Sequence, residues 1–500
     1  MPAPVATAAV APYLLDGRWL RPAGREPIEV RDPADGSLVG RAARAGAEEA
    51  RAAMDAAARA QPAWEALGGA ARARILLRAA ALLRAQREPL ARWITREMGK
   101  VRYEARAEAD GAIENLEYYA AFGRTLSGEE VALQPRGQSL RLLWLPRGVV
   151  VALTPWNFPA ATVTRKIAPA LIGGNTMVLK AASATPLTAL FLARALSRAG
   201  LPPGVLNVIQ GNSAELGPAL LGHPACSTVT LTGSTATGVE ILRGAAPGVV
   251  KCLLELGGKA PVIVAADADL DWAARATVWA RFWNAGQACI AAERVYVDEK
   301  VAARFVAKLS RLTARLRLGP GLARGSEVGP LYSPSARDHV HAMVEAARAD
   351  GARILLGGQL PSRGPLRQGA FYPPTLVGDL SDSSPLVRDE IFGPVLPLLT
   401  FRTLDEVVDR ANRSEYGLSS YVFTRSAAVA ERLAREIRFG ETYVNRVGPE
   451  SPQGYHAGFR RSGLGGEGTR TGVTDYLQLK SVYVDWNDRP SADDLFPYPR

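Results

Sequence analysis

The segment FWNAGQACIAAER, residues 282–294, carries the side chain whose chemistry is easiest to recognise, the cysteine Cys289. Ala288 precedes it and Gly286 lies three positions earlier, so a turn here would present the sulfur with little crowding. A thiolate presented in this way is a competent nucleophile. A free cysteine is also one of the side chains most often buried in a core, so this motif alone leaves a catalytic and a structural cysteine equally open.

Two further motifs could supply the groups that such a nucleophile needs. TPWNFP holds Asn157 in a proline-stiffened turn after the apolar run VVVALT, where a rigid carboxamide could stabilise an oxyanion or merely cap the next helix. ELGGK places Glu255 after two leucines, and partial desolvation there would raise the pKa of its carboxyl and make it a usable base. The alternative for Glu255 is a structural ion pair, for example with Lys259.

Three weaker signals suggest a nucleotide. Gly233 and Ser234, in LTGST, close a strand and open a helix, where free N–H groups could face a phosphate. Lys180 ends the run NTMVLK and could add a positive charge at the same strand-end edge of the sheet. The alternative is that its ammonium group is simply solvated. EIFGPV pairs Glu390 with Phe392 before a turn, where the aromatic taken alone is more readily a core residue than a cofactor contact.

The elements that position these residues follow from the hydrophobic pattern. From residue 148, apolar strand runs alternate with helical stretches, which is typical of a parallel sheet with both faces covered and with ligands at the carboxyl ends of its strands. The pattern restarts at PVIVA, which predicts a second α/β domain. Three helices are expected before this region, at residues 45–63, 70–98 and 103–122. Two apparently isolated strands, residues 139–147 and the segment YLQLKSVYVDW, could pair across subunits.

Composition excludes several classes of function. The 500 residues, 47% of them hydrophobic, predict at least two well-packed domains. The net charge of +11 comes from 52 arginines dispersed along the chain rather than from one basic tract, which argues against nucleic acid as a partner. Three cysteines without paired spacing and no CxxC or HExxH motif argue against a disulfide framework and a metal site. With no apolar run of membrane-spanning length, we expect a cytoplasmic protein without a membrane partner.

TPWNFP, LTGST, ELGGK, FWNAGQAC and EIFGPV, in this order, resemble the aldehyde dehydrogenase superfamily over essentially the whole chain. The 34-residue separation of Glu255 from Cys289 also looks like the spacing in that family. The resemblance implies an α/β fold with a Rossmann-like cofactor domain, an α/β catalytic domain and a small β oligomerisation element, assembled as a homodimer or homotetramer. The cofactor domain is expected to span residues 1–123 and 147–257, and the catalytic domain residues 258–461. The oligomerisation element is expected to span residues 124–146 and 473–500.

The same resemblance assigns roles. Cys289 would attack the aldehyde, Asn157 would hold the oxyanion, Glu255 would activate the water that hydrolyses the thioester, and Lys166 matches a family lysine near this site. Glu390 would bind the nicotinamide ribose. The residues expected to contact the cofactor are Thr154, Pro155, Trp156, Lys180, Ser183, Gly211, Gly233, Ser234, Leu256, Glu390 and Phe392.

Two departures from the family pattern refine the expected specificity. Ser183 stands where NAD-preferring members usually carry a glutamate, and losing that carboxylate removes a repulsion toward a 2′-phosphate, so we expect NADP to be used at least as well as NAD. FGETYVNR, PQGYHAGFRRSG and AERVYV resemble the lactaldehyde and glycolaldehyde dehydrogenase branch, in which residues matching Arg165, Glu450 and His456 hold the substrate hydroxyl. A structural histidine is the alternative for His456. Phe158 and Trp283 complete the expected substrate pocket.

The sequence therefore predicts NAD(P)-dependent oxidation of a small hydroxylated aldehyde, of the lactaldehyde, glycolaldehyde or glyceraldehyde type, to its acid. One alternative is a semialdehyde dehydrogenase, in which Arg165 would bind a substrate carboxylate. The other is a non-catalytic binding protein that retains the fold, against which the intact Cys289, Glu255 and Asn157 argue.

Overall fold

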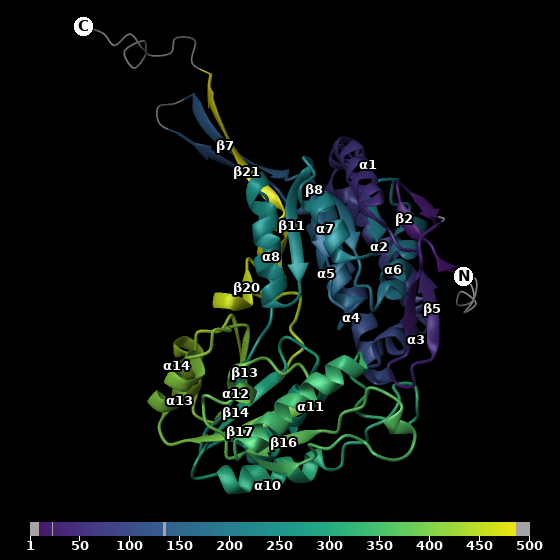
Figure 1. Ribbon diagram of the computed structural model, residues 1–500. Coiled ribbons are helices and arrows are strands. Elements are labelled where there is room, and N and C mark those ends of the chain that lie inside the picture. Colours follow the sequence, from purple (N-terminus) through teal and green to yellow (C-terminus); the bar gives the residue numbers. More distant parts are fainter. Residues whose placement is uncertain (1–9, 23, 134–136, 487–500) are drawn as a thin grey trace.

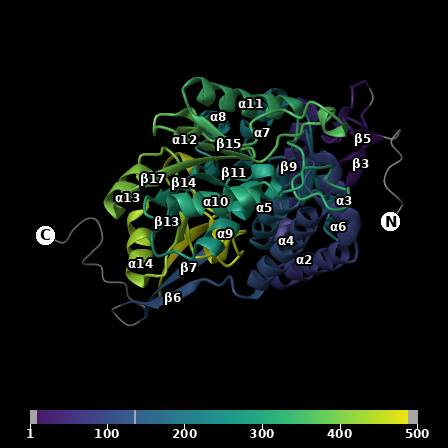
Figure 2. The same cartoon turned by 90° about the horizontal axis from the view of Figure 1, so that it is seen from below.

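A computed structural model describes residues 10–22, 24–133 and 137–486. Two α/β lobes lie one above the other, and a narrow arm of strands extends from the upper lobe (Figure 1). Seen from below, helices α2 and α4 lie side by side on the upper lobe (Figure 2). Residues 1–9 and 487–500, which the sequence assigned to the cofactor domain and the oligomerisation element, lie outside the described residues.

The upper lobe is built on an eight-stranded sheet whose five central strands are parallel. Its core strands are rich in Val, Leu and Ile because helices cover both faces. The order along the sheet is β20 (Gly463–Leu464), β12 (Lys251–Glu255), β11 (Cys226–Thr232), β8 (Val149–Leu153), β9 (Thr176–Lys180), β10 (Leu206–Ile209), β2 (Tyr13–Leu15) and β3 (Arg18–Leu20).

The strand order reverses at β8, which is flanked by β9 on one side and by β11 on the other. In doubly wound sheets, ligands bind at this switch point, outside the carboxyl ends of the strands. A turn at Asp16-Gly17 joins β2 to β3, with both residues at positive φ. A small second sheet lies at the edge of this lobe, in the order β1 (Val10–Ala11), β5 (Leu38–Ala42) and β4 (Ile28–Arg31).

Eight helices of eight residues or more are described in this lobe, and one expectation about them is wrong. The single helix expected at 70–98 is two helices, because the chain turns at Ala85 and Gln86. The bounds are α1 (Ala47–Ala66), α2 (Gly69–Arg84), α3 (Arg87–Met98), α4 (Arg102–Ala121), α5 (Ala161–Ile172), α6 (Pro186–Arg198), α7 (Ser213–Leu221) and α8 (Thr235–Ala245).

The lower lobe has a seven-stranded sheet in which only the edge strand β15 runs antiparallel. The order is β15 (Arg353–Leu356), β16 (Thr375–Gly378), β17 (Val395–Phe401), β14 (Ala292–Asp298), β13 (Ala260–Val264), β18 (Ser419–Phe423) and β19 (Glu441–Val444). Its helices are α9 (Leu270–Phe282), α10 (Ala302–Thr313), α11 (Pro334–Ala349), α12 (Pro385–Arg388), α13 (Leu404–Asn412) and α14 (Ala427–Glu436). The sequence predicted this second α/β unit correctly.

The arm contains the two strands that the sequence suggested were isolated. They pair with each other along their whole length in a three-stranded antiparallel sheet, in the order β21 (Leu477–Asp485), β7 (Gln138–Pro146) and β6 (Glu129–Ala132). The short helix α15 (Thr469–Thr474) leads into β21. The expectation of isolated strands was therefore wrong, since long-range pairing is invisible to local pattern.

Candidate active site

A cavity of about 320 Å³ lies between the lobes and gathers the predicted chemistry. Its walls come from α4 and α5, from the ends of β11 and β12, and from the loops around residues 283–290 and 449–456. The predicted residues that line it are Cys289, Glu255, Asn157, Arg165, Glu450, His456, Phe158 and Trp283.

Cys289 lies in a tight turn after α9. Asn284 and Ala285 have positive φ, and a Cβ on Gly286 would lie 2.4 Å from the Gly393 carbonyl oxygen, so glycine is required there. The cysteine is only partly buried. Burial raises the pKa of its thiol, and the neighbouring His456 imidazole lowers it. Cys289 is therefore not a structural cysteine enclosed in the core.

Asn157 is held by the cysteine loop rather than by a helix end. Its Nδ2 donates to the Gln287 carbonyl oxygen over 3.1 Å, and the Asn284 amide donates to the Asn157 carbonyl oxygen over 3.2 Å. The start of α5 is instead capped by Glu108, which accepts from the Ala160 N–H over 2.7 Å. The helix-cap alternative for Asn157 is therefore wrong.

Glu255 ends β12 and is almost completely buried. Neither of its carboxylate oxygens has a hydrogen-bond partner among the described residues. Burial raises its pKa to about 8, although His456, with Nε2 3.6 Å from Oε2, opposes this. Lys259 pairs with Glu293 over 2.7 Å, so the suggested Glu255–Lys259 ion pair does not form. A raised pKa without a structural partner is the state expected of a base.

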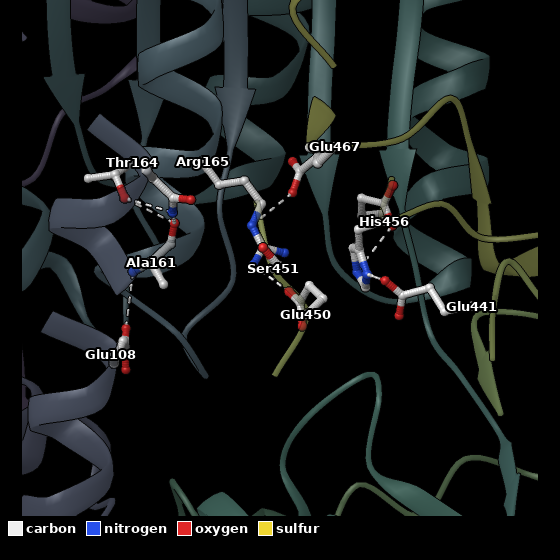
Figure 3. Close-up of polar contacts among 12 residues, drawn as sticks. Glu108, Ala161, Thr164, Arg165, Glu441, Glu450, Ser451, His456 and Glu467 are labelled. Atoms are coloured by element: carbon white, nitrogen blue, oxygen red, sulfur yellow. Dashed lines mark hydrogen bonds and ion pairs between the residues drawn. The ribbon is translucent and has the colours of Figure 1, made fainter. Parts of the chain in front are cut away.

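Arg165 projects from α5 into a cluster of charges (Figure 3), and Lys166 follows it on the same helix. The Arg165 guanidinium contacts the Glu450 carboxylate and lies 3.7 Å from Glu467. The Lys166 ammonium pairs with Glu467 over 2.7 Å and donates to the Thr230 hydroxyl over 3.0 Å. Lys166 is therefore fixed beside the cavity, and the charge of Arg165 is already shared between two carboxylates.

His456 is buried beside this cluster and faces Glu441, as Figure 3 shows, with Nδ1 3.1 Å from Oε1. Burial lowers the pKa of His456, but Glu441, Glu255 and Glu450 together raise it well above its usual value. The pKa of Glu450 falls to about 2, because Arg165 and His456 outweigh the effect of burial. His456 is thus surrounded by three carboxylates that favour its protonated form.

The residues expected at the cofactor meet at one edge of the upper sheet. Lys180 and Leu231 both pair with Leu153, and Thr232 pairs with Glu255, so the ends of β8, β9, β11 and β12 are level. Thr154 and Pro155 follow β8 directly. This edge is the one at which the switch point lies.

The LTGST turn is arranged differently from the expectation. The Gly233 N–H donates to the Glu255 carbonyl oxygen over 2.9 Å, so it is not one of the free N–H groups that a phosphate could use. Ser234 caps α8 by accepting from the Thr237 N–H over 3.2 Å. Gly238 leaves room for Leu256, whose side chain would lie 2.7 Å from a Cβ there. The glycine of this turn thus joins two strand ends.

Ser183 is exposed beyond β9, and its hydroxyl donates to the Gly211 carbonyl oxygen over 3.2 Å. Gly211 itself is packed so closely that a Cβ would lie 2.5 Å from the Ala45 carbonyl oxygen. Burial lowers the pKa of Lys180, which stands at the end of the same strand. The position after β9 therefore offers a hydroxyl and an ammonium group.

The lower lobe contributes the remaining expected contacts. Glu390 is half-buried and accepts from the Gly258 N–H over 2.8 Å, and desolvation of its carboxyl, reinforced by Glu293, raises its pKa to about 7. Phe392 is half-buried and packs edge-on to Trp156 across the lobes, with ring centroids 5.6 Å apart. Phe392 is therefore a residue of the interlobe cleft rather than of the core.

Comparison with known proteins identifies the family. The model of the aldehyde dehydrogenase family matches residues 19–482. The chain belongs to the aldehyde dehydrogenase family. Its relatives include the NADP(+)-dependent D-glyceraldehyde dehydrogenase of Thermoplasma acidophilum, 42% identical over 96% of this chain and 99% of that protein. The NADP(+)-dependent succinate-semialdehyde dehydrogenase of Escherichia coli is 39% identical over 94% of this chain and 97% of that protein.

The fold is equally well matched. The crystal structure of lactaldehyde dehydrogenase from Escherichia coli superposes with a TM-score of 0.92, at 38% identity, over 95% of this chain and 99% of that one. As an aldehyde dehydrogenase with these relatives, the chain is an NAD(P)-dependent enzyme, as the sequence predicted. Among the described residues no helix is long and apolar enough to cross a membrane, and no group of three or more potential ligands could hold a metal ion.

The aldehyde dehydrogenase site also contains charged residues that sequence reasoning missed. They are Glu441 behind His456, Glu467 between Arg165 and Lys166, and the buried pair Lys100–Glu108 behind Asn157. Glu441 lies in FGETYVNR, a segment already noted for its resemblance to the lactaldehyde branch, so that motif carried a usable signal. The others lie in segments with no such motif.

Proposed function

We propose that this aldehyde dehydrogenase oxidises a small hydroxylated aldehyde to its carboxylic acid, with NADP as the electron acceptor. One observation carries the proposal. A thiol, a buried carboxyl without a hydrogen-bond partner in the described chain and a carboxamide line the same cavity as the polar group Arg165, Glu450 and His456. The first set can perform the oxidation, and the second can bind a hydroxyl beside the reacting carbon.

The reaction begins with the Cys289 sulfur attacking the aldehyde carbon, which turns the carbonyl oxygen into an oxyanion. Asn157 uses one amide N–H on the Gln287 carbonyl, and its second N–H and the Cys289 backbone N–H are available to the oxyanion. Burial raises the pKa of the thiol, and His456 opposes this by lowering it, which favours the thiolate. This step breaks the carbonyl π bond and forms a carbon–sulfur bond.

The residues at the switch-point edge would hold a nicotinamide cofactor, which would supply the hydride acceptor that the oxidation needs. Glu390 presents a half-buried carboxylate with one oxygen on the Gly258 N–H, and Lys180 and Ser183 stand at the end of β9. Glu255 then takes a proton from water, which attacks the thioester and releases the acid and the Cys289 thiol. The carboxyl makes no hydrogen bond to a described residue that it would have to break in doing so.

The charges around Arg165 favour a hydroxyl over a carboxylate in the substrate. The guanidinium already contacts Glu450 and lies near Glu467, so an incoming carboxylate would meet two like charges. A hydroxyl can donate to Glu450 and accept from Arg165 or His456. A site that satisfies a buried hydroxyl rejects the analogue that lacks it.

The preference for NADP rests on Ser183. Its hydroxyl and the Lys180 ammonium leave no carboxylate at the end of β9, where one would repel a 2′-phosphate. The two curated relatives described above are, by name, NADP(+)-dependent.

A succinate-semialdehyde dehydrogenase is the second candidate, favoured by the 39% identity with the Escherichia coli enzyme of that name. Steady-state kinetics with glyceraldehyde, lactaldehyde, glycolaldehyde and succinic semialdehyde, each with NADP and NAD, separates the candidates. We expect the highest kcat/KM with a hydroxylated aldehyde and NADP. A higher kcat/KM for succinic semialdehyde would refute the substrate assignment, and a hundredfold preference for NAD, about 2.7 kcal/mol, would refute the cofactor assignment.

We also propose that the upper lobe binds the cofactor, that the lower lobe carries the nucleophile, and that the arm joins subunits of a homodimer or homotetramer. The outer strand β21 exposes Leu479 and Tyr483, 50% and 74% accessible, at the edge of its sheet. Removing residues 477–500 should yield a smaller assembly in light scattering.

A further inference from the structure

Behind His456 lies a carboxylate that the proposed mechanism does not use. Glu441 begins β19, and its side chain is 11% exposed. Its Oε1 lies 3.1 Å from His456 Nδ1, and its Oε2 accepts from the Ser419 hydroxyl over 2.9 Å and from the Tyr443 hydroxyl over 3.1 Å. Both oxygens are therefore held, and the carboxylate cannot turn away from the imidazole.

This arrangement fixes the state of the imidazole. An ionised carboxylate only accepts hydrogen bonds, so the Nδ1 of His456 must carry a proton. The opposite nitrogen, Nε2, then lies 3.6 Å from Glu255 Oε2, on the side of the reacting groups. Among the described residues, the titratable groups that act on the ring are Glu441, Glu255, Glu450, Glu467 and Cys289. The Tyr443 hydroxyl contacts Glu441 rather than the ring.

We propose that Glu441 is a positioning residue that keeps His456 doubly protonated, so that its Nε2–H acts as a donor and a positive charge toward Cys289, Glu255 and the substrate hydroxyl. The contact with the substrate hydroxyl rests on the proposed function, whereas the effect of His456 on the Cys289 thiol does not. A positive charge at this point favours the thiolate form of Cys289 and the carboxylate form of Glu255, which are the forms that react.

The two neighbours of the ring respond as this role requires. His456 lowers the pKa of Cys289 and of Glu255, against burial, which raises both. Replacing the Glu441 carboxylate by an amide would still provide an oxygen that accepts from the Nδ1–H, but it would remove the negative charge that stabilises the imidazolium. The ring would then lose its second proton near neutral pH, and its influence on both neighbours would end.

The test measures alkylation of Cys289 by iodoacetamide as a function of pH, without substrate or cofactor, by mass spectrometry of the cysteine peptide. In Glu441→Gln we expect the midpoint of the rate profile to rise by about one pH unit, so that alkylation below the midpoint slows about tenfold. His456→Gln should show the same shift, and the double variant no more than His456→Gln alone. The matched control is Glu431→Gln, an exposed glutamate paired with Arg435 on α14, which should leave the profile unchanged.

An unchanged profile in Glu441→Gln, or a larger shift in the double variant than in His456→Gln, would overturn the inference. If Glu441→Gln fails to fold, the wild-type enzyme supplies a second measurement. Its sequence has four histidines, and in ¹⁵N-histidine spectra one of them should remain doubly protonated at about pH 8. Four rings that all titrate near pH 6.5 would refute the role. If none of the aldehydes tested is turned over, the proposed function is refuted, whereas the alkylation profile and the histidine spectra still test the role of Glu441.

Discussion

Glu450→Gln tests whether charge at Arg165 selects the substrate. Glutamine has the shape of glutamate and keeps an oxygen that accepts from the guanidinium, but it removes the negative charge in direct contact with Arg165. Glu467, 3.7 Å away and itself paired with Lys166, is then the only carboxylate beside Arg165 among the described residues. The variant therefore frees positive charge in the cavity without opening a void.

The magnitude follows from the geometry. Two unit charges about 4 Å apart interact by about 4 kcal/mol at an effective dielectric constant of 20. The side chains of Arg165 and Glu450 are 23% and 12% exposed, so part of this energy is screened, and a substrate carboxylate would lie farther from the lost charge. We expect about 1.4 to 2.8 kcal/mol to reach the substrate, a tenfold to hundredfold change in relative kcat/KM.

The assay compares kcat/KM for glyceraldehyde and succinic semialdehyde in the wild-type enzyme, in Glu450→Gln and in the surface control Glu431→Gln. In Glu450→Gln the ratio should move toward succinic semialdehyde, because the glyceraldehyde hydroxyl keeps only an uncharged, weaker acceptor while the semialdehyde carboxylate meets a less neutralised cation. The control should leave the ratio unchanged. If both substrates lose the same factor in Glu450→Gln, the charge of Glu450 does not discriminate between them, and the reasoning about Arg165 is wrong.

Three further outcomes test the rest of the site. Cys289→Ala should abolish dehydrogenase turnover while NADP binding, followed by fluorescence titration, is retained; residual turnover would exclude Cys289 as the nucleophile. The pKa of Glu255, raised to about 8, requires kcat to increase with pH through that value as the base loses its proton, and Glu255→Gln should remove both the increase and most of the rate. Ser183→Glu should lower kcat/KM for NADP at least about tenfold and leave that for NAD equal or higher, and equal losses for both cofactors would contradict the repulsion argument.

The sequence predicted the parts of the site that follow directly from strand ends. Asn157 comes four residues after β8, and Glu255 is the last residue of β12. Because parallel strands bring their carboxyl ends to one edge, residues far apart in the chain are placed together once the strands are recognised. Cys289 was found through its motif, and the resemblance of five ordered motifs to one family supplied the rest.

The sequence could not predict contacts that depend on packing between segments. Glu441 reaches His456 only because β19 pairs with β18 at the sheet edge and the chain returns through residues 445–456. Glu467 reaches Lys166 because its backbone pairs with His456, an isolated bridge with no local pattern. The break between α2 and α3 was missed for the opposite reason, since apolar spacing continues through Ala85 and Gln86 although the helix does not.

The contacts behind Asn157 explain how the two lobes present their reacting groups as one site. Asn157 belongs to the upper lobe and Cys289 to the lower, yet the Lys100 ammonium donates to the Asn157 carbonyl oxygen over 2.8 Å and pairs with Glu108 over 2.5 Å. Glu104, one turn away on α4, accepts from the backbone N–H of Asn284 in the cysteine loop over 2.9 Å. Helix α4 therefore holds the oxyanion donor and the nucleophile loop from one rigid element, so a shift between the lobes must break buried charged hydrogen bonds before it can separate the two groups.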